Sequence, residues 1–361
     1  MQLYDYEKEH LSYLRNHLAE CTVLLKQNGA FPLDKPCAIA AFGNGVRKTI
    51  KGGSGSGEVN SRYFVTVEEG LKNAGFTVTS GKWLDAYDAA YVQARKQFVK
   101  DVKALARQMH TMAMYIGMGK VMPEPEYNLP LDGEGDAAIY VLARISGEGN
   151  DRQDARGDIR LTETEKRDIL YLNRKFKKFM LVLNAGGPVD LSEVEEVENV
   201  LVLSQLGVET GDALADILLG KQNPSGKLAT TWSAWEDYCS IGTFGEHNDT
   251  RYHEGIYVGY RYFDTVGKKA LYPFGFGLSY TTFEHNVDAV TLEGTSVTVK
   301  ATVRNTGNIS GKEVIQVYVS APEGKLDKPY QELAGFAKTS ELASGEAKPV
   351  NITFDIRDLA S

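Results

Sequence analysis

Short apolar runs alternate with helical patterns along the first two thirds of the chain. Runs with the length of buried strands cover residues 37–42, 76–79, 138–143, 179–183 and 200–203. Helical patterns lie between or after them, at about residues 62–73, 91–112, 162–176 and 210–219, the third opened by the capping-box pair Thr162 and Glu165. Because strands that alternate with helices pair in parallel, the pattern predicts an α/β sandwich: a mostly parallel sheet with helices on both faces.

Two helical stripes need a separate interpretation. Apolar residues recur at intervals of three and four from Leu11 to Leu25, which predicts an amphipathic leading helix that ends near Asn28 and packs on the sandwich. The long stripe that follows residue 90 ends with Met109 and Met112. We interpret this stripe as core packing rather than as a cofactor site, because thioether side chains commonly fill gaps in cores.

From Phe283 onward, apolar and polar residues alternate, and turn residues such as Asn305-Thr306-Gly307 separate the runs. Strand-like segments lie near residues 284, 300, 316, 335 and 353. They predict an all-β sandwich of the immunoglobulin or fibronectin III type, which has about seven strands when complete. We therefore expect an incomplete sandwich with an unfilled place at one sheet edge, and self-association through the terminal strand at residues 350–356.

These patterns predict four parts of the chain. Residues 1–35 form the leading helix and a linker, and residues 36–235 form the α/β sandwich domain. Residues 236–282 form a connecting segment rich in glycine and aromatic residues, and residues 283–361 form the β domain.

Composition excludes several classes of partner and site. The chain has 361 residues and a net charge of −8, with no basic stripe, so we expect no nucleic-acid partner. Its three cysteines are far apart and its six histidines show no ligand spacing, so we expect neither a disulfide framework, nor a metal site, nor a cofactor. The amino terminus lacks a signal-peptide pattern and no apolar run could span a bilayer, so we expect a cytoplasmic protein without a membrane partner.

The segment 144–152 follows the apolar run at 138–143, so it begins at the carboxyl end of a predicted strand. Open α/β sheets bind their ligands at this edge. Gly147 and Gly149 flank Glu148 and permit backbone conformations closed to other residues, which suits the presentation of one carboxylate to a ligand. The alternative is an ordinary surface loop with solvated charges. We expect Glu148 to be solvent-accessible.

A glycine-serine loop at residues 51–57 follows the first apolar run of the sheet. Its backbone N–H groups and its hydroxyls, those of Ser54 and Ser56, can approach a ligand closely. The loop matches neither common phosphate-binding glycine pattern in register. Sugar binding therefore suits it at least as well as nucleotide binding, and a flexible linker is the third alternative.

Six segments, in order, resemble glycoside hydrolase family 3 over essentially the whole chain. They are residues 23–33, 51–57, 144–152, 255–264, 272–280 and 311–318. The resemblance is to that family's α/β sandwich domain followed by its fibronectin type III-like domain, and it implies a retaining hydrolase of the β-glucosidase type. The substrate that this implies is a β-linked glucoside or a short oligosaccharide.

The resemblance also implies roles for particular residues. Glu148 matches the family's general acid/base, and Ser56, with Ser54 as the weaker candidate, matches the loop that binds the sugar in the −1 subsite. The family's aspartate nucleophile lies on a (β/α)8 barrel, and nothing in this chain resembles that barrel. Since the chain starts at the leading helix of the sandwich, it resembles the inverted branch of the family, in which these two domains precede the barrel.

Two hypotheses follow. In the first, the chain is part of a β-glucosidase, either truncated or one half of a split protein, and a barrel in cis or in trans completes its active site. The isolated chain is then expected to be inactive. In the second, it is a non-catalytic carbohydrate-binding or assembly module. The intact loop around Glu148 favours the first, because a module without catalytic duty has no chemical need for a glutamate there.

Overall fold

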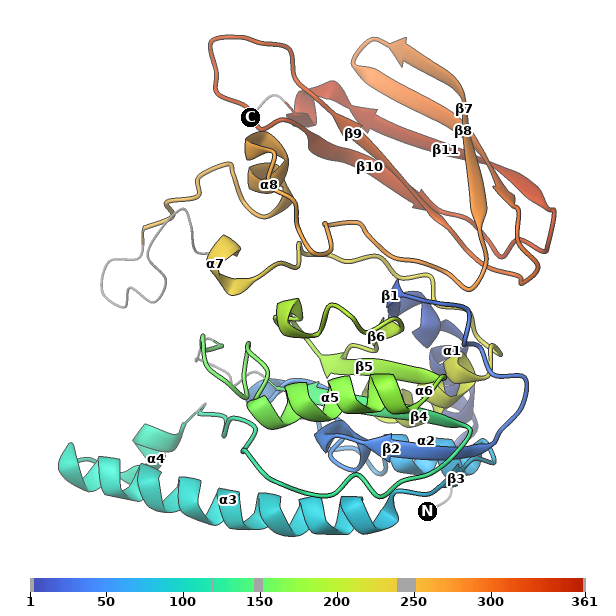
Figure 1. Ribbon diagram of the computed structural model, residues 1–361. Helices are drawn as coiled ribbons and strands as arrows, with labels where there is room; N and C mark the ends of the chain where they lie inside the picture. The colour runs from blue at the N-terminus through green and yellow to red at the C-terminus, as the bar shows by residue number, and fades with distance from the viewer. Residues whose placement is uncertain (1–2, 119, 146–151, 239–250, 360–361) are drawn as a thin grey trace. The chain divides into compact units, whose positions relative to one another are not determined.

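The computed structural model describes residues 3–118, 120–145, 152–238 and 251–359. The chain divides into two compact units, residues 1–222 and 223–361 (Figure 1). The first unit is the α/β domain, and it ends at Gln222, whereas the sequence pattern extends that domain to residue 235. Backbone hydrogen bonds between Trp232 and Tyr272 explain the difference, because they tie the segment after Gln222 to the connecting segment of the second unit.

The first unit is built on a six-stranded sheet in the order β1-β6-β5-β4-β2-β3. Its strands are β1 Val23–Lys26, β2 Ala38–Phe42, β3 Thr77–Val78, β4 Ala137–Arg144, β5 Phe179–Ala185 and β6 Val200–Val202. The strands β2 to β6 run parallel, and β1 pairs antiparallel with β6. The predicted mostly parallel sheet is therefore confirmed.

Helices cover this sheet. They are α1 Asp5–His17, α2 Val67–Asn73, α3 Gly81–Gln108, α4 Ala113–Gly117, α5 Glu163–Lys175 and α6 Thr210–Leu218. Helix α5 lies across β4 and β5 on the near side of the sheet in Figure 1, and α2 packs against α6. The capping box predicted for α5 is present: Thr162 accepts a hydrogen bond from the backbone of Glu165, whose side chain accepts one from the backbone of Thr162.

Strands β4 and β5 form the centre of the core, because every residue of both is buried. Each has two strand neighbours, and a parallel strand with helices on both faces has no solvent side. Continuous apolar runs rather than alternating ones are the result, and burial of this apolar surface is the main stabilising contribution to the fold. The buried centre ends at Arg144 and Ala185, at the carboxyl edge of the sheet.

The predicted leading helix is too long. Helix α1 ends at His17, and the residues from Val23 to Lys26 form β1 instead, with Leu24 and Leu25 almost completely buried. The apolar spacing of three and four residues corresponds to α-helical structure only as far as Leu18. The apolar run after it is short enough to fit either a helix or a strand, and pairing with the free edge of β6 makes it a strand.

The prediction that Met109 and Met112 belong to the core is wrong. Both are more than half exposed, and of the α3 residues only Trp83, Leu84, Tyr87 and Ala106 are buried. Helix α3 is long enough that its second half reaches beyond the sheet (Figure 1), where the short α4 packs against it. A helical stripe predicts which side of a helix is apolar, but not whether another element covers it.

The second unit contains α7 Trp235–Tyr238 and α8 Tyr260–Val266, followed by five strands in the described residues. These strands are β7 Phe283–Glu293, β8 Ser296–Asn305, β9 Val314–Val319, β10 Glu332–Lys338 and β11 Ala347–Asp355. They form a three-stranded sheet, β11-β8-β7, and a two-stranded sheet, β10-β9. Val303, Leu342, Val350 and Ile352 form a buried cluster of this unit.

All five predicted strand segments of the β domain correspond to these strands. Strand β11 has one strand neighbour, β8, in the part of the chain that the structure describes. Self-association through this strand remains a prediction.

Candidate functional site

The two loops that the sequence singles out leave the same edge of the sheet on neighbouring strands. The glycine-serine loop follows β2 and the loop that carries Glu148 follows β4, and these strands are parallel neighbours with Phe42 opposite Tyr140. The strand order reverses at this point, since the chain goes from β2 outward to β3 and then back to β4. Open α/β sheets bind ligands in the crevice at such a switch point.

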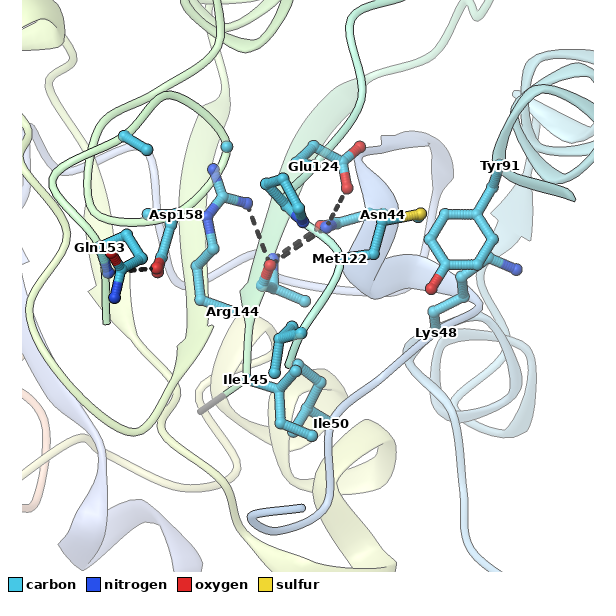
Figure 2. Close-up of a pocket in the computed structure, with 15 residues that line it drawn as sticks. Asn44, Lys48, Ile50, Tyr91, Met122, Glu124, Arg144, Ile145, Gln153 and Asp158 are labelled. Atoms are coloured by element: carbon cyan, nitrogen blue, oxygen red, sulfur yellow. Dashed lines mark hydrogen bonds between the residues drawn. The ribbon is translucent and has the colours of Figure 1, made fainter. Parts of the chain in front are cut away.

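A pocket of about 340 Å³ lies at this switch point (Figure 2). It is lined by residues that follow β2, by the end of β4 and the loop after it, by Tyr91 of α3, and by the segment before β4. These residues are Asn44, Lys48, Ile50, Tyr91, Val121, Met122, Pro123, Glu124, Ala143, Arg144, Ile145, Gln153, Ala155, Gly157 and Asp158.

Glu148 lies outside the described residues, within 146–151. The residues on either side are described: Ile145 follows β4 directly and lines the pocket, and Arg152 donates from Nε to the Asp158 carboxylate over 2.5 Å. The role of Glu148 and its exposure to solvent remain predictions.

Ser54 and Ser56 lie in the described part of the glycine-serine loop. Ser56 is exposed, in the 3-10 turn from Gly55 to Gly57, and Ser54 directly precedes this turn. The base of the loop is held by Asn184 at the end of β5, whose side chain accepts from the backbone N–H of Ile50 at 2.6 Å and donates to its carbonyl at 2.9 Å. A sugar-binding role for the two serines remains a prediction.

Asn44 is the first residue of the site that sequence reasoning missed. Its side chain accepts a hydrogen bond from the Ala143 N–H at 2.7 Å and donates one to the Ala143 carbonyl at 3.1 Å. Gly43 makes this possible: its φ is +92°, and a Cβ there would lie 2.4 Å from the Val141 carbonyl oxygen. The Gly43-Asn44-Gly45 sequence at the end of the first apolar run was the available signal.

Glu124 is the second missed residue. Its carboxylate is buried and accepts hydrogen bonds from the Tyr87 hydroxyl at 2.8 Å and from Asn44 Nδ2 at 2.8 Å. Burial, together with the nearby Glu165, raises the pKa of Glu124 to about 7, against the opposing effects of Arg144, Tyr87 and Asn44. Figure 2 shows the Glu124 carboxylate next to the Asn44 amide. No local sequence pattern marks Glu124.

Arg144 and Glu165 form a buried ion pair beside the loop. The guanidinium donates to both carboxylate oxygens, at 2.9 and 2.6 Å, and the two side chains are 4% and 1% exposed. Arg144 Nε also donates to the Asp158 carbonyl at 2.8 Å. Arg144 opens the loop segment and Glu165 belongs to the predicted capping box, but their pairing could not be read from the sequence.

Two further findings concern the described residues alone. Among them, no three His, Cys, Asp or Glu side chains lie close enough to hold a metal ion. In that same part of the chain, no helix combines the length and the apolar character needed to cross a membrane.

A family model for the glycosyl hydrolase family 3 C-terminal domain matches residues 22–280. The chain belongs to glycoside hydrolase family 3. A model for a fibronectin type III-like domain matches residues 313–361. Both domains implied by the sequence resemblance are therefore confirmed.

Curated relatives of this family 3 chain include beta-glucosidases. It is 36% identical to beta-glucosidase A of Butyrivibrio fibrisolvens over an alignment of 401 residues, which covers 98% of this chain and 47% of the relative. It is 34% identical to a beta-glucosidase of Ruminococcus albus, covering 98% of this chain and 37% of the relative.

Solved structures show the same relation. Beta-glucosidase 3B of Thermotoga neapolitana in complex with alpha-D-glucose is 36% identical and superposes with a TM-score of 0.81, covering 98% of this chain and 49% of that one. The family 3 chain therefore spans about half the length, or less, of the relatives that it matches.

Proposed function

We propose that this chain supplies the general acid/base and a sugar-binding loop to the active site of a retaining β-glucosidase. The observation that carries the proposal is the position of the two loops, which leave the carboxyl ends of neighbouring strands at the switch point of the sheet. The relatives named beta-glucosidases support a β-linked glucoside or a short oligosaccharide as the substrate.

In this mechanism, Glu148 acts twice. As an acid, it gives its proton to the glycosidic oxygen while a carboxylate nucleophile attacks the anomeric carbon, so that the leaving group departs as a neutral alcohol and a glycosyl-enzyme forms. As a base, it then takes a proton from the water that cleaves this intermediate. Ser56, with Ser54 as the weaker candidate, hydrogen-bonds to hydroxyls of the sugar that reacts.

The nucleophile is the family's barrel aspartate, so the proposed partner is a (β/α)8 barrel, joined to this chain or supplied as a separate polypeptide. Retaining hydrolysis requires two carboxyl groups about 5 to 5.5 Å apart. Only one of them is assigned to this chain. The chain without a barrel should therefore not hydrolyse an aryl β-glucoside measurably.

The test compares Glu148→Gln with Asp154→Asn in the enzyme completed by its barrel. Asp154 is an exposed carboxylate of the same loop that pairs with Arg160, so its variant removes the same charge without removing the proposed acid. Since general acid/base catalysis contributes about 10²- to 10⁴-fold, Glu148→Gln should lower kcat/KM by about that factor for an alkyl glucoside. A dinitrophenyl glucoside should lose much less, because its leaving group needs little protonation.

Equal losses on the two substrates, or the same profile in Asp154→Asn, would contradict the assignment of Glu148. A completed protein that binds glucosides but shows no turnover that depends on Glu148 would favour the non-catalytic module instead.

A further inference from the structure

The base of the loop that carries Glu148 is closed by side chains from distant parts of the chain. Strand β2 pairs with β4 only as far as Phe42 opposite Tyr140, and the backbone then turns away at Gly43. Beyond this point the Asn44 amide bonds both backbone groups of Ala143, the penultimate residue of β4. The side chain therefore supplies hydrogen bonds to β4 where the β2 backbone no longer pairs with it, as far as the start of the loop.

The other end of the loop is held from the segment before β4. The Glu124 N–H donates to the Gly157 carbonyl at 2.9 Å. Gly157 has a φ of +84°, and a Cβ there would lie 2.4 Å from the Glu124 carbonyl oxygen, so the two backbones are in direct contact. The Asp158 carboxylate then accepts from Arg152 Nε at 2.5 Å and from the Gln153 N–H at 2.6 Å, which anchors the returning chain.

Asn44 connects the two ends. Its Nδ2 donates to the Glu124 carboxylate at 2.8 Å as well as to Ala143, and Arg144 Nε links β4 to the Asp158 carbonyl at 2.8 Å. Asn44, Glu124, Gly157, Asp158, Arg144 and Ala143 thus form a closed ring of hydrogen bonds and peptide bonds around the loop base, which we call the neck ring. Removing Asn44 opens this ring at two places at once.

We propose that Asn44 is a positioning residue for the reaction: through the neck ring it sets where the chain leaves β4 before Glu148 and where it returns past Glu124 after Glu148. This inference rests on the proposed function. A displacement of about 1 Å of a catalytic group can cost about 100-fold in rate, so a ring that fixes both ends of the loop has a direct kinetic consequence.

Asn199 offers a matched control for Asn44. It is a buried asparagine before β6 that also joins separate segments through its amide, accepting from the Asn28 N–H and donating to the Phe179 carbonyl, each at 2.9 Å. Phe179 is the first residue of β5, so Asn199 lies at the amino edge of the sheet. Its replacement by alanine removes comparable hydrogen bonds far from the loop.

The experiment compares Asn44→Ala with Asn199→Ala in the chain and in the barrel-completed enzyme. Amide hydrogen exchange of peptides covering residues 143–160 should become faster in Asn44→Ala and stay unchanged in Asn199→Ala. In the completed enzyme, Asn44→Ala should lower kcat/KM by about 10- to 100-fold for an alkyl glucoside. A dinitrophenyl glucoside should lose at most about threefold, because its departure depends little on the acid.

If Asn44→Ala does not fold, Tyr87→Phe provides a milder variant, because it removes only the hydroxyl that donates to Glu124 from outside the ring. Tyr87→Phe should also lower kcat/KM more for the alkyl glucoside than for the dinitrophenyl glucoside, but by a smaller factor than Asn44→Ala. An equal loss on both substrates, or an Asn199→Ala profile that matches Asn44→Ala, would overturn the inference. If Glu148→Gln loses more kcat/KM on the alkyl glucoside than on the dinitrophenyl glucoside and Asn44→Ala does not, only the positioning role fails. If Glu148→Gln itself shows no such difference between the substrates, the proposed function fails.

Discussion

Asn184, at the base of the glycine-serine loop, and Asn44, at the base of the loop that carries Glu148, bind the backbone in the same way. Each side-chain amide accepts from the N–H and donates to the carbonyl of a single residue, Ile50 in the first case and Ala143 in the second. An asparagine side chain carries both an amide acceptor and an amide donor, so it can hydrogen-bond both backbone groups of one residue where a strand has ended.

The surroundings of the two amides differ. Asn184 also donates to the Ser204 carbonyl, so its hydrogen bonds within the described part of the chain all join neutral backbone groups. Asn44 donates to the carboxylate of Glu124, which lies close to the buried pair of Arg144 and Glu165. Neutral hydrogen bonds hold a chain at any pH, whereas a base that includes buried charges depends on the ionisation of its members. Of these two loops, the one to which we assign proton transfer is the one whose anchoring contacts include buried charged groups.

The largest expected effect comes from removing the Arg144 cation, because the base of the glycine-serine loop has no such buried ion pair among its described contacts. Arg144→Met leaves the Glu165 carboxylate buried without its cation, which should lower the free energy of unfolding by about 3–5 kcal/mol. Asn184→Ala, which loses only neutral hydrogen bonds, should cost about 1–3 kcal/mol. Urea denaturation of the same chain at pH 7 measures both. Equal losses in the free energy of unfolding would mean that the buried ion pair stabilises its loop base no more than neutral hydrogen bonds stabilise the other.

The pH dependence of stability tests the comparison next. The folded-state pKa of Glu124 is raised to about 7 from the ordinary value of 4.5, so its contribution to stability is fully present below pH 4.5 and is lost as the pH rises through 7. Over this range the wild type should lose up to about 3 kcal/mol relative to Glu124→Gln, whose neutral amide does not titrate. Asp168, whose pKa burial raises to about 6, titrates equally in both proteins and cancels in the difference.

Denaturation midpoints of the wild type and Glu124→Gln at pH 4, 5.5, 7 and 8 provide this measurement. The cost of Asn184→Ala should be the same at each pH. A constant difference between wild type and Glu124→Gln would show that Glu124 titrates alike in the folded and unfolded states.

The smallest expected effect concerns the glycine-serine loop itself. If Ser56 donates or accepts one neutral hydrogen bond with the sugar, Ser56→Ala should raise KM of the completed enzyme by about 2- to 10-fold. Ser54→Ala should have a smaller effect, and neither variant should change the preference between alkyl and dinitrophenyl glucosides. Steady-state kinetics on both substrates check this, and a larger effect of Ser54→Ala would reverse the assignment of the two serines.

Local patterns predicted those parts of the fold that depend on local periodicity and burial. The apolar runs of β4 and β5 and the five strands of the β domain follow from them, as does the capping box of α5, because each of these signals lies within one element. The stripe that ends at Met112 was misread, because whether an apolar face is covered depends on the distance the helix extends past the sheet.

The sequence by itself determined the parallel sheet, the β domain, the family and the two loops that are candidates for chemistry. Only the tertiary structure decided what holds those loops: Asn44 lies 80 residues from Glu124 and 99 from Ala143, and Arg144 lies 21 from Glu165. Such contacts depend on which strands become neighbours, and a strand order that reverses between β2 and β4 leaves no periodic trace in the chain. The raised pKa of Glu124 has the same origin, because burial is a property of the assembled edge and not of the residue.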